Sequence, residues 1–413
     1  MNKIYLFFTK VVLLIPAAFL VLLIRLLKPF FVVRLGGLDI GRIGGVIIID
    51  WYLAECYAGK HNKKYYDVFY LTSSTGKISN RAWLKIVGRS CRIFKFFKLG
   101  QLVYKINQRL PGAQEHLIPS YDAVPFYNKE YIGRDTAQCV LNHSQPAFKF
   151  TAQEESYGQK GLNELGVSKD SLFVCFHARD SAYLNSFSNK DWSYHDFRDS
   201  NIDNYLPAAE ILAQRGYYCL RVGSIAEKAI HSIHPRVIDY TTSGKRTELL
   251  DIYLGAKCHF FICSDTGMSL FPEMFRRPVV YVNWAPLLRV PYFYILSGLI
   301  IPKKFYLRRE QRFLTFKEII DSEFGSISRA EILEKLDIEL IENTPEEITA
   351  VALEMDERIK GTWKTTAEDE ELQERFWTLF DPYQIKNPGV RIGADFLRQN
   401  QQILNIRTLQ TLR

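Results

Sequence analysis

The sequence predicts an α/β protein with parallel sheets, divided into two domains, on three observations. Its 413 residues are enough to form two separate hydrophobic cores. Short apolar runs alternate with helical segments between residues 172 and 282, which is typical of a parallel sheet covered by helices on both faces. Residues 258–284 predict a strand, a polar turn, a helix and a second strand in succession.

The N-terminal segment is predicted to be a membrane anchor. Residues 4–24 are apolar apart from Thr9 and Lys10, a length that could cross a hydrocarbon core of about 30 Å. The presence of Lys10 and Pro16 leaves an in-plane or half-inserted hairpin as the alternative. No cleavage site follows the segment, so a removed signal peptide is not expected.

If this segment spans a membrane, the charges beside it predict its orientation. Arg25, Lys28 and Arg34 follow it, whereas Lys3 and the amino terminus precede its uncharged part. The larger positive charge stays in the cytoplasm. The expected location is therefore the cytoplasmic side of the cell inner membrane.

The first half after this segment is predicted to form strands at 30–35 and 67–71 and helices at 44–58 and 81–97. The β-branched run at 46–49 also fits a strand, but it continues without a break into a helical pattern that ends at Gly59. Residues 110–150 contain four prolines and are expected to be mostly loop.

The second half has the clearer pattern. Strands are predicted at 172–177, 217–222, 237–240, 259–263 and 278–282, and helices at 205–214 and 247–256. From residue 320 onward the chain is predicted to be helical, with acidic runs on solvated helix faces. The expected domains are an anchor (1–29), an N-terminal α/β domain (30–160), a second α/β domain (161–335) and a C-terminal helical segment packing across both domains (336–413).

The net charge of +8 is unevenly distributed. Residues 1–34 carry +5 and residues 77–109 carry +9, in both cases without an acidic residue, so the remainder carries −6. The basic residues of the second stretch alternate with Phe, Leu, Ile and Trp, which suits the surface of an anionic membrane better than nucleic acid. The alternative is an amphipathic core helix with a solvated basic face.

Several chemical classes are excluded by missing motifs. The seven cysteines lack CxxC spacing, which argues against structural zinc and favours a reducing compartment. The sequence contains no GxxxxGK[ST], clean GxGxxG, HExxH, Asp-x-Asp or GxSxG. Any chemistry is therefore expected to be independent of metals and cofactors.

Three polar loops follow predicted strands of the second domain, beginning at His177, Arg221 and Ser264. In a parallel sheet these loops meet at one edge, where ligands of open α/β sheets bind. They would bring Arg179 and Arg221 beside Gly223 and Ser224 and beside the polar groups of Asp265, Thr266, Gly267 and Ser269. Two guanidinium groups and a helix N-terminus suit a diphosphate, because each arginine can hold two oxygens.

Each of these residues also has a purely structural alternative. An arginine at a strand end can form an ion pair, Gly267 can serve a turn with positive φ, and Asp265 can cap the next helix. His177 can be a catalytic or a core histidine. Glu273 can contact a ribose or face solvent on its helix.

Residues 170–285 resemble a family of bacterial glycosyltransferases associated with surface polysaccharide loci. The resemblance is carried by His177-Ala-Arg179-Asp180, Arg198-Asp-Ser-Asn-Ile-Asp-Asn-Tyr-Leu-Pro207, Arg221-Val-Gly223 and Asp265-Thr266-Gly267, with a weaker similarity at 42–44. The sequence departs from the family at Arg198-Asp, where an adjacent Arg-Asn would be closer.

The His-x-Arg element is similar to that of fucosyltransferases, and the Asp-Thr-Gly turn is similar to that of heptosyltransferases. Both groups have the GT-B arrangement, in which two Rossmann-like domains face each other across a cleft and the second binds the donor. The resemblance thus implies a nucleotide-sugar donor and a glycan or lipid-linked acceptor, as in lipopolysaccharide synthesis.

In the mechanism expected from this resemblance, Arg179 and Arg221 neutralise the departing nucleotide diphosphate. Asp180 and His177 are the nearest candidates for the base that deprotonates the acceptor, and Asp39, Asp50 or Glu55 are equally open. Two rival functions remain, a catalytically inactive membrane scaffold of polysaccharide assembly and another sugar-nucleotide enzyme such as an epimerase.

Overall fold

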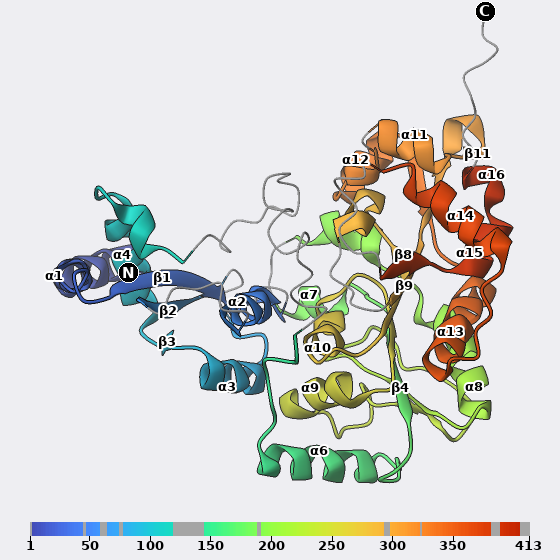
Figure 1. Ribbon diagram of the computed structural model, residues 1–413, viewed down its shortest axis with the longest axis horizontal. Helices are drawn as coiled ribbons and strands as arrows, with labels where there is room; N and C mark the ends of the chain where they lie inside the picture. Colours follow the sequence, from blue (N-terminus) through green and yellow to red (C-terminus); the bar gives the residue numbers. More distant parts are fainter. Residues whose placement is uncertain are drawn as a thin grey trace, which may run out of the picture. The chain divides into compact units, whose positions relative to one another are not determined.

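The computed structural model describes residues 2–43, 47–57, 64–73, 77–118, 144–187, 191–292, 298–322, 324–380 and 389–404, and it divides into two compact units (Figure 1). The units are Met1–Lys149 and Phe150–Arg413. The expected α/β class with parallel sheets is confirmed in both.

The first unit contains a parallel sheet of three strands in the order β1-β2-β3. Its elements are α1 (Asn2–Leu26), β1 (Val32–Asp39), α2 (Ile47–Tyr57), β2 (Tyr65–Thr72), α3 (Arg81–Ser90), β3 (Ile93–Phe94) and α4 (Phe97–Gln108). The apolar pattern after residue 46 therefore forms the predicted helix rather than a strand.

The single basic helix predicted at 81–97 is wrong. Cys91 takes extended backbone angles and ends α3, and the chain then forms β3 before α4 begins. The apolar residues keep a helical spacing through the break, so the pattern alone does not reveal it. The break arises because Ile93 and Phe94 pair with β2 instead of joining the helix.

Helix α1 confirms a helix in the N-terminal segment, but a membrane span finds no support. Its side chains are described from Val12 onward, so Lys3 and Lys10 lie outside the described side chains. Within the described residues, no helix has the length and apolar character needed to cross a membrane.

The second unit is built on a seven-stranded sheet in the order β13-β9-β8-β7-β4-β5-β6, in which every neighbouring pair is parallel. The strands are β4 (Phe173–His177), β5 (Tyr218–Arg221), β6 (Val237–Asp239), β7 (Phe261–Cys263), β8 (Val279–Trp284), β9 (Gly298–Pro302) and β13 (Val390–Ile392). A separate antiparallel sheet joins β10 (Lys304–Leu307), β11 (Arg312–Phe313) and β12 (Ile338–Ile341).

Helices cover both faces of the large sheet, with α9 and α10 on one side and α8 and α13 on the other (Figure 1). The helices of this unit are α6 (Ala152–Glu164), α7 (Ala182–Phe187), α8 (Leu206–Gln214), α9 (Glu248–Lys257), α10 (Leu270–Met274), α11 (Phe316–Asp321), α12 (Ala330–Lys335), α13 (Pro345–Lys360), α14 (Ala367–Trp377), α15 (Ala394–Gln399) and α16 (Gln401–Leu404). Strands β8 and β9 are buried along their whole length, as expected for a sheet with two covered faces.

The second unit begins before the expected boundary at residue 160, because α6 packs on α9. Gly158 and Gly161 make this contact possible. A Cβ at Gly158 would lie 2.3 Å from the Tyr253 ring, and one at Gly161 would lie 2.9 Å from Leu250. Two glycines one turn apart thus bring the two helices into close contact.

The C-terminal segment agrees in part with the helical, acid-faced segment that was predicted, since Glu346, Glu368, Glu370 and Glu371 are exposed on its helices, but it also contains strands and buried acids. It adds β12 to the antiparallel sheet and β13 to the edge of the large sheet. Glu347 and Asp369 are buried, and each forms a capping box with the threonine that starts its helix. These two acids are therefore part of the core and not of a solvated face.

The strand order of the second unit locates a binding edge. The chain runs outward from β4 to β5 and β6, returns through α9 to β7 beside β4, and continues to β8 and β9 in the opposite direction. This is the strand order of dinucleotide-binding folds, in which ligands bind outside the carboxyl ends of the strands where the order reverses. That point lies between β4 and β7.

Candidate functional site

Arg179 lies at the reversal point, just after β4. Its backbone N–H donates to Ser264 Oγ (3.0 Å), which joins the β4 loop to the β7 loop. Its Nη1 donates to the His195 carbonyl (3.2 Å) and contacts Asp199, whereas its Nη2 is buried and makes no hydrogen bond. Burial, and secondarily the neighbouring Arg198, lower the pKa of Arg179 to about 10, so it stays protonated at neutral pH.

Arg198 lies beside Arg179 and contacts the turn after β7. Its Nη1 donates to Asp265 Oδ2 (3.2 Å), and its Nε is buried without a hydrogen-bond partner. Asp265 therefore forms an ion pair in this structure, while Thr266 takes the helix-capping role by accepting from the Met268 N–H. The Arg198-Asp199 pair, where the sequence departs from the resembled family, thus lies within the site.

Lys303 follows β9 and is the third cation at this edge. Its ammonium group is buried and donates to the carbonyl of Asp199 (2.6 Å), the residue whose carboxylate contacts Arg179. Burial, and to a lesser degree Arg179, lower the pKa of Lys303 to about 8 against the opposing effect of Glu342. We refer to Arg179, Arg198 and Lys303 as the cation cluster.

His177 ends β4 and contacts the turn after β7. Its Nδ1 lies 2.8 Å from the Val222 carbonyl, which can only accept, so this nitrogen carries the proton. Its Nε2 is then free to accept from the Thr266 hydroxyl (3.3 Å). Burial lowers the pKa of His177 to about 4, so the ring is neutral at pH 7.

Gly223 lets His177 approach the β5 loop. Its φ is +150°, and a Cβ at this position would lie 3.1 Å from His177 Nδ1 and 3.4 Å from Thr241 Oγ1. Glycine is required here both by the backbone conformation and by the close histidine ring.

Arg221 has a structural partner. Its Nη1 donates to the Lys228 carbonyl (2.6 Å) and to Asp239 Oδ2 (3.2 Å), and Asp239 is its register partner on β6. Its charge still acts on His177, whose pKa it lowers. These bonds favour the ion-pair alternative for Arg221 over the diphosphate contact predicted from the sequence.

Asp180 ties two loops together. Its Oδ1 accepts from the Ala182 N–H (3.1 Å) and its Oδ2 from the Glu227 N–H (3.0 Å). These contacts give Asp180 a positioning role between the β4 and β5 loops.

The predicted helix N-terminus after β7 is short. Gly267 opens a 3-10 turn, Gly267–Ser269, without a positive φ, and α10 follows with five residues. The Ser269 hydroxyl donates back to the Thr266 carbonyl (2.7 Å). Glu273 is buried and accepts from the Tyr281 hydroxyl, so neither alternative predicted for it, ribose contact or solvent exposure, agrees with its contacts.

The other predicted residues are Ser224, in the loop after β5, and three acidic residues of the first unit. Ser224 follows Gly223 and is half-buried. In the first unit, Asp39 accepts from the Gly41 N–H (2.9 Å) and Asp50 is buried, while the side chain of Glu55 lies outside the described residues. Among the described residues, no three His, Cys, Asp or Glu side chains form a group that would hold a metal ion.

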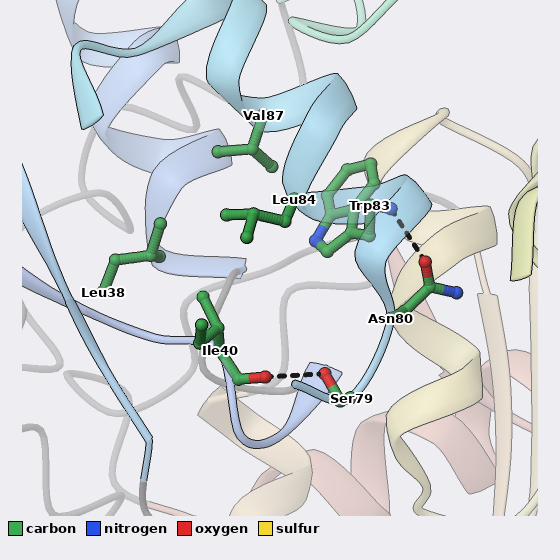
Figure 2. Close-up of a pocket in the computed structure, with 7 residues that line it drawn as sticks. All are labelled: Leu38, Ile40, Ser79, Asn80, Trp83, Leu84 and Val87. Carbon is green, nitrogen blue, oxygen red and sulfur yellow. Dashed lines mark hydrogen bonds between the residues drawn. The ribbon is translucent and has the colours of Figure 1, made fainter. Parts of the chain in front are cut away.

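A small apolar hollow lies in the first unit (Figure 2). Ser79 donates to the Ile40 carbonyl (3.0 Å), and Asn80 accepts from the Trp83 N–H (2.7 Å), so the polar groups at its edge are already bonded. The volume of about 10 Å³ is that of about one water molecule, too small for a sugar.

Sequence reasoning missed Lys303 and the role of Arg198. Lys303 directly follows the apolar run 298–302. The search for polar residues just after predicted strands, which led to Arg179 and Arg221, would therefore also have found Lys303. Arg198 lies in a 3-10 turn, Ser193–Arg198, rather than at a strand end. No local sequence signal places it beside Asp265.

Two solved glycosyltransferases are similar to this chain. One is the glycosyl transferase family 9 protein from Veillonella parvula DSM 2008, with 11% identity and a TM-score of 0.40 over 74% of this chain and 96% of that protein. The other is ADP-heptose LPS heptosyltransferase II from E. coli, with 13% identity and a TM-score of 0.41 over 65% of this chain and 90% of that protein.

No known family model matches the sequence, and no curated protein does. The resemblance to glycosyltransferases predicted from the sequence is nevertheless also found among solved structures. Because both TM-scores are low, the function proposed below rests on the side chains at the sheet edge.

Proposed function

We propose that this protein is a glycosyltransferase that transfers a sugar from a nucleotide-sugar donor to a glycan or lipid-linked acceptor in surface polysaccharide synthesis. The proposal rests on the cation cluster at the strand-order reversal. Arg179 and Arg198 each keep a buried N–H group without a hydrogen-bond partner, and Lys303 is buried beside them. A buried donor without a partner costs about 1–3 kcal/mol, which a bound anion would recover.

A nucleotide diphosphate is the anion that best fits these three groups. Asp199 and Asp265 already contact the cluster, so a small anion would compete with two carboxylates. A diphosphate can displace these contacts, because several oxygens bind several N–H donors at once. The site position also agrees with nucleotide binding, since the loops after β4 and β7 meet there.

In the proposed reaction, the bond between the sugar carbon and the β-phosphate oxygen breaks while the acceptor oxygen bonds to that carbon. The acceptor proton passes to a base, and the nucleotide diphosphate departs with an additional negative charge. Arg179, Arg198 and Lys303 would stabilise this charge without a metal ion. His177 would fix the Thr266 side chain by accepting its hydroxyl hydrogen, and Asp180 would keep the β4 and β5 loops together.

The same proposal includes a GT-B arrangement, in which the first unit binds the acceptor, and a location on the cytoplasmic side of the inner membrane. A reducing compartment agrees with the cysteines. Five described cysteines are buried thiols without a disulfide, namely Cys91, Cys175, Cys219, Cys258 and Cys263.

The test is calorimetric titration of the full-length protein with UDP, GDP, ADP and CMP, followed by an assay for transfer from the matching sugar nucleotide. We expect one nucleotide to bind, and Arg179→Gln to weaken that binding by about 10- to 100-fold, since a charge-assisted hydrogen bond contributes about 1.5–3 kcal/mol. Arg236→Gln is the matched control, because Arg236 is exposed on the same unit and should leave affinity unchanged.

Other outcomes would identify the rival functions. A protein that binds none of the nucleotides would be a scaffold. Conversion of the free sugar nucleotide without any acceptor would indicate an epimerase. Equal loss of affinity in both arginine variants would show that the cation cluster is not the binding site.

A further inference from the structure

Helix α1 has one face in the core of the first unit. Ala17, Val21 and Ile24 are buried against Val33 and Leu35 of β1 and against Val103 of α4. The three helix residues follow at intervals of four and three, so they lie on one side of the helix. This contact fixes the orientation of the helix between Ala17 and Ile24.

The helix is also tied to α4 by Arg25. Its Nε and Nη2 donate to the Asn107 side chain (3.1 and 3.0 Å), and its Nη1 donates to the Pro111 carbonyl (2.8 Å). Figure 1 shows α1 and α4 beside each other in the first unit. The helix is therefore held against the body of the first unit from Ala17 to Arg25.

The opposite face of α1 exposes large apolar side chains. Ile15 is 79% exposed and Phe30, just after the helix, is 78% exposed. Residues at helical spacing of three and four make up this face, namely Val12, Ile15, Phe19, Leu22 and Leu26; together with Phe30 in the turn that follows, we call them the apolar stripe. A contiguous exposed apolar patch of this kind marks an interaction surface.

The charges of the neighbouring helix indicate what this surface meets. Lys98 and Lys105 project from α4 as exposed side chains, and Arg109 and Lys95 flank that helix. Within the described residues none of these four cations forms an ion pair, and no acidic residue occurs between positions 77 and 109. Phe96, between Lys95 and α4, is 71% exposed.

The charge of the whole first unit agrees with an anionic partner. Residues 1–149 contain 21 Lys and Arg against 8 Asp and Glu, a net charge of +13, so the second unit carries 8 − 13 = −5. A second copy of this surface would meet its own positive charge, and nucleic acid would leave the apolar stripe uncovered.

We propose that the apolar stripe inserts in the plane of an anionic lipid bilayer, with the cations of α4 on the lipid head groups. An amphipathic helix of this kind binds through apolar burial together with attraction to anionic lipids. This inference specifies how the membrane location included in the proposed function is reached, and the surface contains no residue of the nucleotide site, so vesicle binding and nucleotide binding can fail independently.

The test is flotation of the full-length protein with vesicles, without nucleotide. Vesicles of phosphatidylcholine are compared with vesicles of equal parts phosphatidylcholine and phosphatidylglycerol. We expect binding to the anionic vesicles, weakened by added salt, and a loss on the order of tenfold in the double variant Ile15→Asn, Phe19→Asn. A triple glutamine variant of Lys98, Lys105 and Arg109 should lose the preference for anionic lipid.

The control is the double variant Leu172→Asn, Ile233→Asn, which removes two exposed apolar side chains of the second unit and should bind as the wild type does. Unchanged vesicle binding in the stripe variant would overturn the proposal. So would a wild-type dimer that binds no vesicles and becomes monomeric in the stripe variant, because the stripe would then bind a second copy. All variants change exposed residues, and circular dichroism of each variant tests whether it is folded.

Discussion

Lys303 combines a cost in stability with a proposed role in binding. Its pKa falls from 10.5 to about 8 through burial, so keeping it charged at pH 7 costs roughly 3 kcal/mol. The hydrogen bond from its ammonium group to the Asp199 carbonyl recovers about 1 kcal/mol. A buried charge retained at this cost indicates a purpose other than stability.

We predict that Lys303→Met raises the free energy of unfolding at pH 7 by about 1–3 kcal/mol and weakens nucleotide diphosphate binding at least about tenfold. Urea unfolding and calorimetric titration measure the two effects. The stability gain should shrink as the pH rises from about 8 to 10.5, where the folded lysine is neutral and the unfolded one still binds a proton. Lys303→Arg, which keeps the charge, is the control; affinity unchanged in the methionine variant would contradict the assignment.

His177 predicts a dependence of stability on pH. Its folded pKa is about 4 and its unfolded value is 6.5, because burial disfavours the charged ring. Between these values the unfolded state binds a proton that the folded state does not. The contribution of His177 to the free energy of unfolding is therefore fully present above pH 6.5. It is lost as the pH falls toward 4, and amounts to at most on the order of 3 kcal/mol.

In His177→Asn this loss between pH 6.5 and 4 should be smaller, as measured by urea unfolding at a series of pH values. Asn can still donate to the Val222 carbonyl, so the main hydrogen bond is retained. Burial raises the pKa of Asp251 to about 6, so this residue makes the free energy of unfolding change with pH in the opposite direction. Its contribution is the same in both proteins and therefore cancels when they are compared. Identical slopes in the two proteins would show that His177 is not the group that titrates.

At the level of elements, close helix packing in the second unit depends on the absence of a side chain. Gly158 of α6 lies against Tyr253 of α9, and the ring leaves no room for a Cβ. Gly88 of α3 is also helical but exposed, and its nearest neighbour to a Cβ would be Ile93 Cδ1 at 3.6 Å, an ordinary contact. The two glycines therefore differ in packing and share their helical backbone.

We predict that Gly158→Ala lowers the free energy of unfolding by about 1–3 kcal/mol through overpacking. Gly88→Ala should instead raise it by up to about 1 kcal/mol, because alanine has the higher helix propensity. Chemical denaturation of both variants tests the pair. A destabilisation of the same size in both would mean that the α6–α9 contact is not the cause.

At the level of the whole molecule, every member of the cation cluster belongs to the second unit, and so do all seven strands of its sheet. The first unit carries the positive charge and the apolar stripe. The proposed nucleotide site and the proposed membrane surface are therefore carried by different units of the chain.

We predict that a fragment of residues 150–413 folds and binds the same nucleotide with an affinity within about threefold of the full-length protein, a difference of about 0.6 kcal/mol, because the whole cation cluster belongs to this unit. It should not bind anionic vesicles. Circular dichroism establishes folding, and calorimetric titration and flotation measure the two kinds of binding. A folded fragment that no longer binds nucleotide would show that the first unit contributes to the site.

The sequence by itself determined the fold class and the edge of the sheet where the proposed site lies. Apolar runs such as 172–177 and 278–282 predicted strands, because burial on both faces of a parallel sheet leaves a continuous apolar run. Polar residues directly after these strands then indicated one common edge. This information is local, since it depends on residues close together in the chain.

Only the tertiary structure decided which charged groups meet. Asp239 pairs with Arg221 because β6 lies beside β5, and Lys303 joins Arg179 through Asp199 although the two cations are far apart in the chain. Such partners depend on the order of the strands and on the course of irregular turns, which no periodic pattern encodes. The pKa values that follow from burial are decided at the same level, because desolvation depends on everything packed around the group.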